Sequence, residues 1–188
     1  MAKSAVFCYY WNMSRLVLPN VKYKKSFLED FFGRRSKTDL PHNSWGKYLD
    51  KKLLKKDFTG FVKFFLSQRT GKNLPKGYVP QTVFWLVDKN KILGTLSLRH
   101  KLTPHLKIIG GHIGYEITPK FRGQGYGKLI LKMGLKKAKA LGIKNALITC
   151  DITNLKSKKV IEANGGKFAS QVEQGQDNPK KLRYWIKT

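Results

Sequence analysis

Residues 122–128 read Arg-Gly-Gln-Gly-Tyr-Gly-Lys, and this stretch decides how the rest of the chain is interpreted. It follows a run typical of a β-strand, residues 112–117, and it opens a helical pattern over residues 125–141. Glycines between a strand and a helix let successive main-chain N–H groups turn toward one point, where the positive end of the helix adds its field. The stretch therefore predicts a site for a pyrophosphate group.

The spacing of the glycines excludes two common nucleotide-binding loops. Gly123, Gly125 and Gly127 alternate along the chain, whereas the dinucleotide fingerprint requires G-x-G-x-x-G. The triphosphate loop G-x-x-x-x-G-K-[ST] does not fit this stretch either. The expected pyrophosphate thus belongs to neither of these ligand classes.

The rest of the chain predicts strands and helices that surround this loop. The expected strands are residues 15–18, 82–87, 91–98, 112–117, 146–150, 167–172 and 182–186. The expected helices are residues 23–32, 45–56, 60–68, 125–141 and 155–163, and the segment around Pro104 is interpreted as a loop. Helices interleaved with a strand-rich centre predict the α/β (α+β) class, with a mixed central sheet flanked by helices.

Length and composition indicate one folded domain. A chain of 188 residues with 41% hydrophobic side chains can bury a sizeable core, and no apolar run approaches the ~18 residues of a membrane span. We expect the domain to cover residues 15–188, with residues 1–14 as an extra strand or a loose extension. Cys8 and Cys150 suit neither a disulfide framework nor a metal site, so a reducing, cytoplasmic setting without metal is expected.

The charge is the most unusual bulk property. There are 38 Lys and Arg against 11 Asp and Glu, which gives a formal net charge of +27 and a pI of about 10.2. Such a field attracts nucleic acid, ribosomes, anionic membrane surfaces and anionic cofactors alike. The alternative is a lysine-rich composition solvated over the whole surface, and charge alone identifies no partner.

Several separated motifs resemble the GNAT superfamily of N-acetyltransferases. Arg122, Gly125 and Gly127 match the R/Q-x-x-G-x-G/A loop with which that family binds acyl-CoA. Residues 114–117 are similar to the family's fourth strand, and residues 150–154 are similar to its fifth strand and the entrance of the next helix. The order of the expected elements from residue 15 onward is also similar to the family fold.

A narrower resemblance is to a branch of predicted bacterial acetyltransferases. It rests on residues 99–100, 111–115 and 164–166, and it implies no particular substrate.

The resemblance implies a single-domain acyl-CoA N-acyltransferase fold, in which the fourth and fifth strands splay apart and the pantetheine arm lies between them. It implies an N-acetyltransferase that binds acetyl-CoA as cosubstrate and transfers the acetyl group by direct attack of a primary amine of a small molecule or a protein. The residues expected to bind acetyl-CoA are Tyr115, Ile117, Thr118, Arg122, Gly123, Gln124, Gly125, Tyr126, Gly127, Lys128, Asn154 and Ser157. Arg122 and Lys128 have the alternative of being solvated surface charges.

The attacking amine must lose a proton, and three residues are candidates for the catalytic base. His112 and Glu116 lie four residues apart on one expected strand, so both side chains would point to the same face. His112 has the more suitable ordinary pKa, about 6.5, whereas Glu116 would need burial to raise its pKa. Asp151 is the third candidate. Each candidate also has a structural alternative. His112 would be a hydrogen-bonded structural histidine, Glu116 would pair with a lysine, and Asp151 would cap the next helix.

One feature of the family is absent. Many members have a Tyr that protonates the leaving thiolate in the helix after Asn154, and alignment on that helix places Ile161 there. No Tyr occurs between Tyr126 and Tyr184, so another group or solvent would take this role.

Two classes of function remain open at this stage. The first is the enzyme, for which a polycationic acceptor is disfavoured by the net charge, and an acidic small amine or a protein amine on a ribosome or nucleic-acid-bound partner is easier to reconcile. The second is a basic nucleic-acid or ribosome-binding module on an acetyltransferase-like scaffold, with weak or no catalysis. Monomer and dimer are equally compatible with the sequence.

Overall fold

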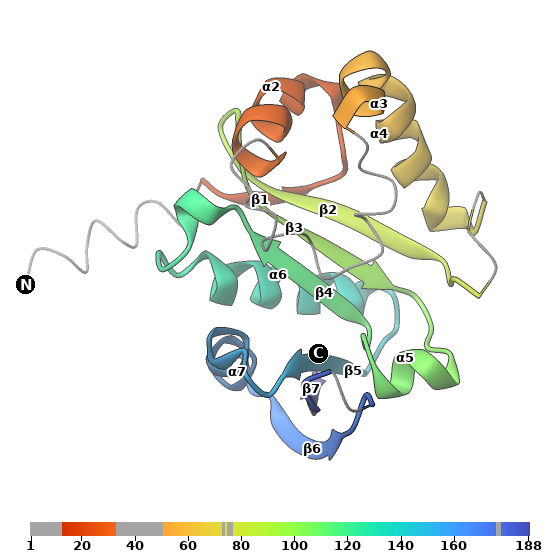
Figure 1. Ribbon diagram of the computed structural model, residues 1–188, viewed down its shortest axis with the longest axis vertical. Coiled ribbons are helices and arrows are strands. Elements are labelled where there is room, and N and C mark those ends of the chain that lie inside the picture. The colour runs from red at the N-terminus through yellow and green to blue at the C-terminus, as the bar shows by residue number, and fades with distance from the viewer. Residues whose placement is uncertain (1–12, 33–50, 73, 75–76, 176–177) are drawn as a thin grey trace, which may run out of the picture.

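Two antiparallel sheets form the centre of the molecule (Figure 1). The structure, a computed structural model, describes residues 13–32, 51–72, 74, 77–175 and 178–188. The first sheet has the order β1-β2-β3-β4 and the second the order β5-β7-β6. The strands are β1 (Arg15–Val17), β2 (Gln81–Asp88), β3 (Lys91–Arg99), β4 (Ile113–Ile117), β5 (Asn145–Asp151), β6 (Lys167–Val172) and β7 (Lys181–Lys187).

The first sheet is buried on both faces, and β2 shows how its sequence achieves this. Val83, Trp85 and Val87 pack into an aromatic core, whereas Phe84 and Leu86 belong to the core on the opposite face. Successive side chains of a strand point to opposite faces, so the continuous apolar run of β2 supplies both cores. β2 and β3 form a hairpin in which Asp88 opposes Lys91.

The N-terminal helices cover the aromatic face of this sheet (Figure 1). They are η1 (Val21–Tyr23), α2 (Lys24–Ser26), the π-helical turn η2 (Phe27–Phe32), α3 (Lys51–Lys56), α4 (Phe58–Ser67) and η4 (Gln68–Thr70). Tyr23, Phe27 and Phe58 bring aromatic rings against Trp85, with the Phe27 and Trp85 centroids 5.2 Å apart. Aromatic side chains contribute large buried areas, so this face is stabilised mainly by ring packing.

The other face of the first sheet is covered by α6 (Tyr126–Ala140). On the far side of α6 lie α7 (Leu155–Glu162) and the second sheet (Figure 1). Leu129, Ile130 and Leu135 of α6 are buried in the core that also contains Ile161 of α7. The connection from β3 to β4 contains α5 (Pro104–Ile108), where the sequence predicted only a loop. Thr103 caps this short helix by accepting the Leu106 N–H at 3.2 Å, a local signal that the proline had obscured.

The first and second sheets meet at the start of β4. The main-chain N–H of His112 donates to the Leu147 carbonyl of β5 at 2.7 Å. Gly111 has φ +60, and a Cβ at this position would collide with the Leu147 carbonyl, so only glycine allows the two backbones to approach this closely. Beyond this junction β4 and β5 belong to different sheets, which confirms the expected splay between the fourth and fifth strands.

The expected α/β class and nearly all expected elements are confirmed within the described residues. Every strand pairing described is antiparallel, since the parting of β4 from β5 divides the predicted mixed sheet in two. Residues 1–12 of the predicted extension and residues 45–50 of the predicted second helix lie outside the described residues. Within those residues, no helix has the length and apolarity needed to traverse a bilayer.

Candidate functional site

The edge of β4 that faces β5 is where a ligand can reach main-chain groups. The N–H of Arg99 donates to the His112 carbonyl at 2.8 Å, and the N–H of Thr118 donates to the Leu93 carbonyl at 2.9 Å. Main-chain groups of alternate residues in an antiparallel ladder point to opposite edges, so the even-numbered residues of β4 face β3. The N–H and C=O groups of Tyr115 and Ile117 therefore point toward the gap.

The glycine loop lies at the end of this gap. It follows the turn η5 (Pro119–Phe121) and leads into α6, whose N-cap is Gly125 with φ 80. Gly123 also has a positive φ of 78, a conformation that glycine adopts without strain. The first N–H groups of a helix have no carbonyl one turn earlier, and a glycine cap offers no side chain to them. The loop thus directs main-chain donors and the positive end of a 15-residue helix to one place.

The neighbours of the loop fix its position. Tyr126 is buried and packs edge-on against Phe121, with ring centroids 6.2 Å apart. A Cβ on Gly127 would approach Val160 of α7 to 3.1 Å, so the small residue keeps α7 close to the start of α6. Asn164 supports the same junction by donating to the Lys128 carbonyl at 3.4 Å.

The charged and amide side chains of the loop make local contacts. Arg122 turns back to β4, where its Nε donates to the Ile117 carbonyl at 3.1 Å and its guanidinium lies 3.6 Å from Glu116. Gln124 donates to the Lys120 carbonyl at 3.0 Å, and Lys128 is exposed. These side chains leave a cationic rim around the main-chain donors.

A pair of hydroxyl groups bridges β4 and α7. The Tyr115 hydroxyl and Ser157 Oγ are 3.1 Å apart. Burial raises the pKa of Tyr115 well above its ordinary value, against the opposing effect of the Ser157 hydrogen bond. The phenol therefore keeps its proton and remains a hydrogen-bond donor over the whole physiological pH range. Burial likewise raises the pKa of the nearby Cys150 thiol to about 11, so this cysteine stays protonated.

Two predicted contacts of acetyl-CoA have internal partners, and the position aligned with the family tyrosine is in the core. Asn154 caps α7, because its Oδ1 accepts the Ser157 N–H at 3.0 Å. Thr118 is fully buried, and its hydroxyl donates to the Ile92 carbonyl at 3.0 Å. Ile161 is also fully buried, so this position points into the core.

His112 connects the two sheets through its ring. Its Nδ1 accepts the Leu147 N–H at 2.9 Å, so the neutral ring carries its proton on Nε2 and has no vacant lone pair for a substrate proton. Burial, together with the charge of Arg99, lowers the pKa of His112. Arg99 itself donates to the carbonyls of Gly110 and Gly111, both at 3.0 Å. His112 is thus the hydrogen-bonded histidine that the sequence left open as an alternative, and the structure adds its partner, Leu147, and the support from Arg99.

The two carboxylate candidates lie in different surroundings. Glu116 opposes Thr95, which in turn opposes Trp85, so its side chain lies on the face of the sheet covered by the N-terminal helices. Asp151, at the end of β5, forms an ion pair with Lys181 on the adjacent strand β7. The structure does not bring His112 and Glu116 to one face, because β4 begins only at Ile113 and the His112 ring turns to β5.

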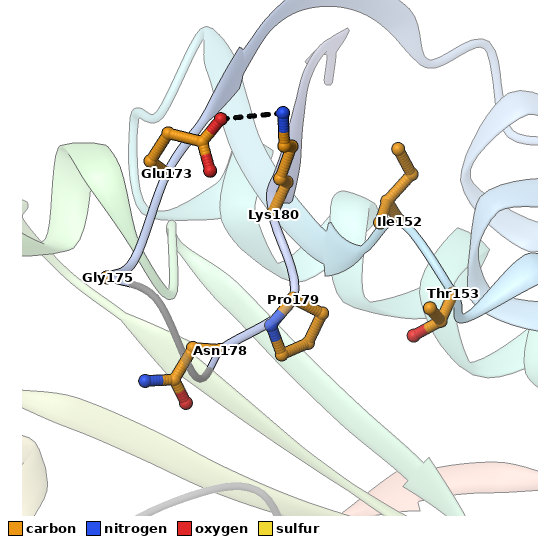
Figure 2. Close-up of a pocket in the computed structure, with 7 residues that line it drawn as sticks. All are labelled: Ile152, Thr153, Glu173, Gly175, Asn178, Pro179 and Lys180. Carbon is orange, nitrogen blue, oxygen red and sulfur yellow. Dashed lines mark ion pairs between the residues drawn. The ribbon is translucent and has the colours of Figure 1, made fainter.

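A groove lies beside the end of β5 and the tip of the β6–β7 hairpin (Figure 2). Its volume is about 580 Å³, and it is lined by Ile152, Thr153, Glu173, Gly175, Asn178, Pro179 and Lys180. Lys180 and Glu173 form an ion pair at 2.7 Å, and the Lys180 carbonyl accepts the Ile152 N–H at 2.9 Å. The groove therefore offers polar groups and an exposed apolar side chain next to the start of α7. No cluster of metal ligands occurs in the described part of the chain.

Comparison with known proteins gives a consistent family. A family model described as an acetyltransferase (GNAT) domain matches residues 28–167. A search of curated protein sequences finds no match.

Solved structures of acetyltransferases share the fold. RimL, a ribosomal L7/L12 alpha-N-protein acetyltransferase in complex with coenzyme A, superposes with a TM-score of 0.68 at 17% identity, over 93% of this chain and 94% of that chain. RimJ of Mycobacterium smegmatis, in complex with CoA-disulfide, superposes with a TM-score of 0.68 at 14% identity, over 93% of this chain and 81% of that chain. MccE, a microcin C7 self-immunity acetyltransferase in complex with acetyl-CoA and AMP, superposes with a TM-score of 0.62 at 15% identity, over 94% of this chain and 93% of that chain. At these identities the likeness establishes the fold.

The hydrogen bond of His112 predicts a pH dependence of stability. Because the folded state lowers the pKa of His112, the free energy of unfolding has its full value above the ordinary pKa of about 6.5 and falls as the pH drops toward the folded pKa. His112→Asn retains an acceptor for the Leu147 N–H but does not titrate, so its stability should fall less over this range. Urea denaturation between about pH 5 and pH 7 measures the difference.

His112→Ala serves as the control, since it leaves the Leu147 N–H without this acceptor. It should cost about 1–3 kcal/mol relative to the wild type near pH 7, and this cost should shrink as the pH falls and the wild type loses the same contribution. His100, whose pKa is also lowered by burial, is present in all three proteins and cancels in the comparison. Parallel curves for the wild type and His112→Asn would contradict the assignment.

Proposed function

The chain belongs to the GNAT family of acetyltransferases, and on this premise we propose that it transfers the acetyl group of acetyl-CoA to the α-amino group of a protein. The observation that carries the proposal is the open edge of β4 that ends at the glycine loop of α6. An extended ligand with amide groups can pair with such an edge, and its pyrophosphate can then meet the helix N-terminus. Pantetheine joined to a nucleotide by a pyrophosphate has this chemistry.

The residues present fit acetyl-CoA as a substrate. Main-chain groups of Tyr115 and the N–H of Ile117 would pair with the pantetheine amides, and N–H groups of residues 124–127 would hold the pyrophosphate, because the Lys128 N–H already donates to the Gly125 carbonyl at 3.1 Å. Arg122 and Lys128 would supply cations beside them. Gly123 has open space beside it, and Gly123 and Gly125 both have a positive φ that lets the backbone turn for this approach. Acetyl-CoA supplies the activated thioester.

Glu116 is the residue that we assign to proton removal from the amine. Its side chain is 22% exposed, so a water molecule can reach it and relay the proton. Arg122 is one cation beside it, at 3.6 Å. An Arg122 engaged by the pyrophosphate would attract the Glu116 charge less, which would make proton uptake by the carboxylate more favourable when acetyl-CoA is bound. Asp151 is less suitable because its charge is committed to Lys181.

The hydroxyls of Tyr115 and Ser157 take the place of the absent tyrosine. One hydroxyl donates to the other, which leaves the second proton to donate to the sulfur of the leaving thiolate. A thiol has an ordinary pKa near 8.5, whereas the pKa of Tyr115 lies far above that, so the pair stabilises the thiolate by a hydrogen bond and does not release its proton. The final proton comes from the amine or from solvent.

The acceptor assignment rests on the groove at the β6–β7 hairpin and on charge. The groove has one carboxylate among its lining residues, Glu173, which is paired with Lys180, so it suits the end of a peptide better than a small polycation. RimL acts on a ribosomal protein, as its description states, and this supports an acceptor of the same kind here. A groove for an acceptor beside the expected acetyl-CoA site favours an enzyme over a purely binding module. The presence of only two cysteines supports a cytoplasmic setting for a domain of residues 15–188.

Binding of acetyl-CoA should raise the thermal unfolding temperature, with a stabilisation of about 2.7 kcal/mol at a hundredfold excess over Kd. Gly125→Val should abolish this shift, because a β-branched residue cannot adopt φ 80 without strain and would fill the loop. Gly142→Val is the matched control, since Gly142 has φ 79 at the other end of α6 and should keep the shift. A normal shift in Gly125→Val would refute the loop assignment.

Glu116→Gln should lower kcat by about 10²–10⁴-fold, because the amide cannot accept the proton. The KM for acetyl-CoA should change little. Free-thiol release with a panel of peptides that have a free α-amine measures both constants. Loss of turnover in His112→Asn with retention in Glu116→Gln would instead make the histidine the base.

Ser157→Ala should lower kcat by about 10–100-fold, the effect expected when one hydrogen bond to a charged group is lost. Tyr115→Phe should give a similar loss, and the double variant should lose little more than either, because both hydroxyls act as one unit. Ser157→Thr, which retains the hydroxyl, should recover most of the rate. Additive losses in the double variant would show that the two hydroxyls act independently.

A further inference from the structure

The outer surface of α6 carries charge of a single sign. Between residues 128 and 139, every side chain that is exposed is a lysine. Lys128, Lys132, Lys136 and Lys139 follow one another at intervals of four, four and three residues, so they lie along one side of the helix. We call these four residues the α6 lysine row. At 1.5 Å per residue the row is about 16 Å long.

Nothing within the helix balances this charge. The sequence from residue 118 to 150 contains eight Lys or Arg residues and no Asp or Glu. Like charges four residues apart destabilise a helix, and the row has two such pairs, Lys128 with Lys132 and Lys132 with Lys136, without a compensating carboxylate in the helix. Lys137 differs from the row because its ammonium lies over the Phe84 ring, 5.7 Å from the centroid.

The adjacent helix does not compensate either. Lys156 and Lys159 of α7 are exposed, and Glu162 is the single carboxylate of that helix. Glu162 accepts from the Tyr184 hydroxyl at 3.3 Å and pairs with Lys158 at 4.0 Å. Among the residues that the structure describes, no carboxylate pairs with these four lysines, and an anionic partner would relieve the repulsion between them.

We propose that the α6 lysine row docks the enzyme on the phosphate backbone of RNA next to its protein acceptor. A membrane partner is disfavoured, because the apolar face of α6 is buried in the core and cannot enter a bilayer. A protein partner is disfavoured, because a protein interface has an apolar or aromatic centre and the row has neither. Phosphate contacts need only cations, and the row has no side chain that reads bases. The choice of RNA rests on the proposed ribosomal kind of acceptor.

Part of the row is separable from the acetyl-CoA site. Lys128 borders the glycine loop and would contact the pyrophosphate, whereas Lys132, Lys136 and Lys139 extend along the helix away from it. The test therefore uses the triple variant Lys132→Gln, Lys136→Gln, Lys139→Gln. Its control is Lys55→Gln, Lys56→Gln, Lys63→Gln on α3 and α4, where three exposed lysines are removed with the same change in net charge.

Fluorescence anisotropy of the full chain with a labelled, single-stranded RNA of mixed sequence measures affinity between about 50 and 200 mM KCl. The α6 triple variant should bind about tenfold more weakly at low salt, and its slope of log K against log salt should be less steep by about 2, since each phosphate contact contributes about 0.7. The control triple variant should lose less than half as much. Equal losses in both variants, or no binding by the wild type, would overturn the proposal.

Other partners are tested in the same titration. Tighter binding to duplex DNA, to polyglutamate or to vesicles with anionic lipids would overturn the assignment to RNA. The thermal shift with acetyl-CoA is measured on the same proteins and should be unchanged in the α6 triple variant. If the α6 triple variant loses RNA binding but keeps its thermal shift with acetyl-CoA, the lysines act in docking and not in binding of acetyl-CoA. If the wild type shows no thermal shift with acetyl-CoA, the proposed function is refuted, and the RNA binding result is then independent of it.

Discussion

The structure depends on the edge of β4, which has β5 as a neighbour but not as a partner along most of its length. Main-chain N–H and C=O groups need hydrogen-bond partners, and proteins usually pair or cover an exposed sheet edge. Here the hydrogen bond from the His112 N–H to the Leu147 carbonyl joins β4 and β5 only at the beginning of the gap. Arg99 donates to the carbonyls of Gly110 and Gly111, which directly precede His112. Side chains of both sheets share one core with α6 and α7, so the two sheets are held beside each other although β4 pairs only with β3.

The pleat of β4 then divides the chemistry between its two faces. Tyr115 points toward α7 and meets Ser157, whereas Glu116 points toward the N-terminal helices. Successive side chains of a strand alternate, so neighbouring residues reach opposite sides of the same ligand. A leaving sulfur and an attacking amine also lie on different sides of a reacting thioester. One short strand can therefore place the hydroxyl of Tyr115 and the carboxylate that we propose as the base on opposite faces, without bringing them into contact.

Local patterns in the sequence were sufficient for the fold and for the position of the glycine loop between β4 and α6, because glycine spacing and apolar periodicity are properties of neighbouring residues. The sequence also named Glu116, Tyr115 and Ser157 as candidates, but it could not predict which side chains meet. The sequence treated residue 112 as part of a regular strand, but the bond from Leu147, 35 residues away, turns the His112 ring to β5. The pairing of Tyr115 with Ser157 spans 42 residues, and the π-helical turn and α5 likewise depend on tertiary context or a cap hidden by a proline.

The small number of carboxylates relative to lysines and arginines bears on the proposed mechanism. Glu116, Asp151, Glu162 and Glu173 each lie beside a lysine or arginine, so none of these four is an isolated anion. A carboxylate beside a cation is a weak base, and it gains basicity only if the cation is drawn to another anion. Among the four cations, Arg122 is the one that belongs to the phosphate loop. In the proposed function, a pyrophosphate at this loop would draw Arg122 away from Glu116 and so link cofactor binding to the basicity of that carboxylate, a link that positive charge elsewhere on the surface would not provide.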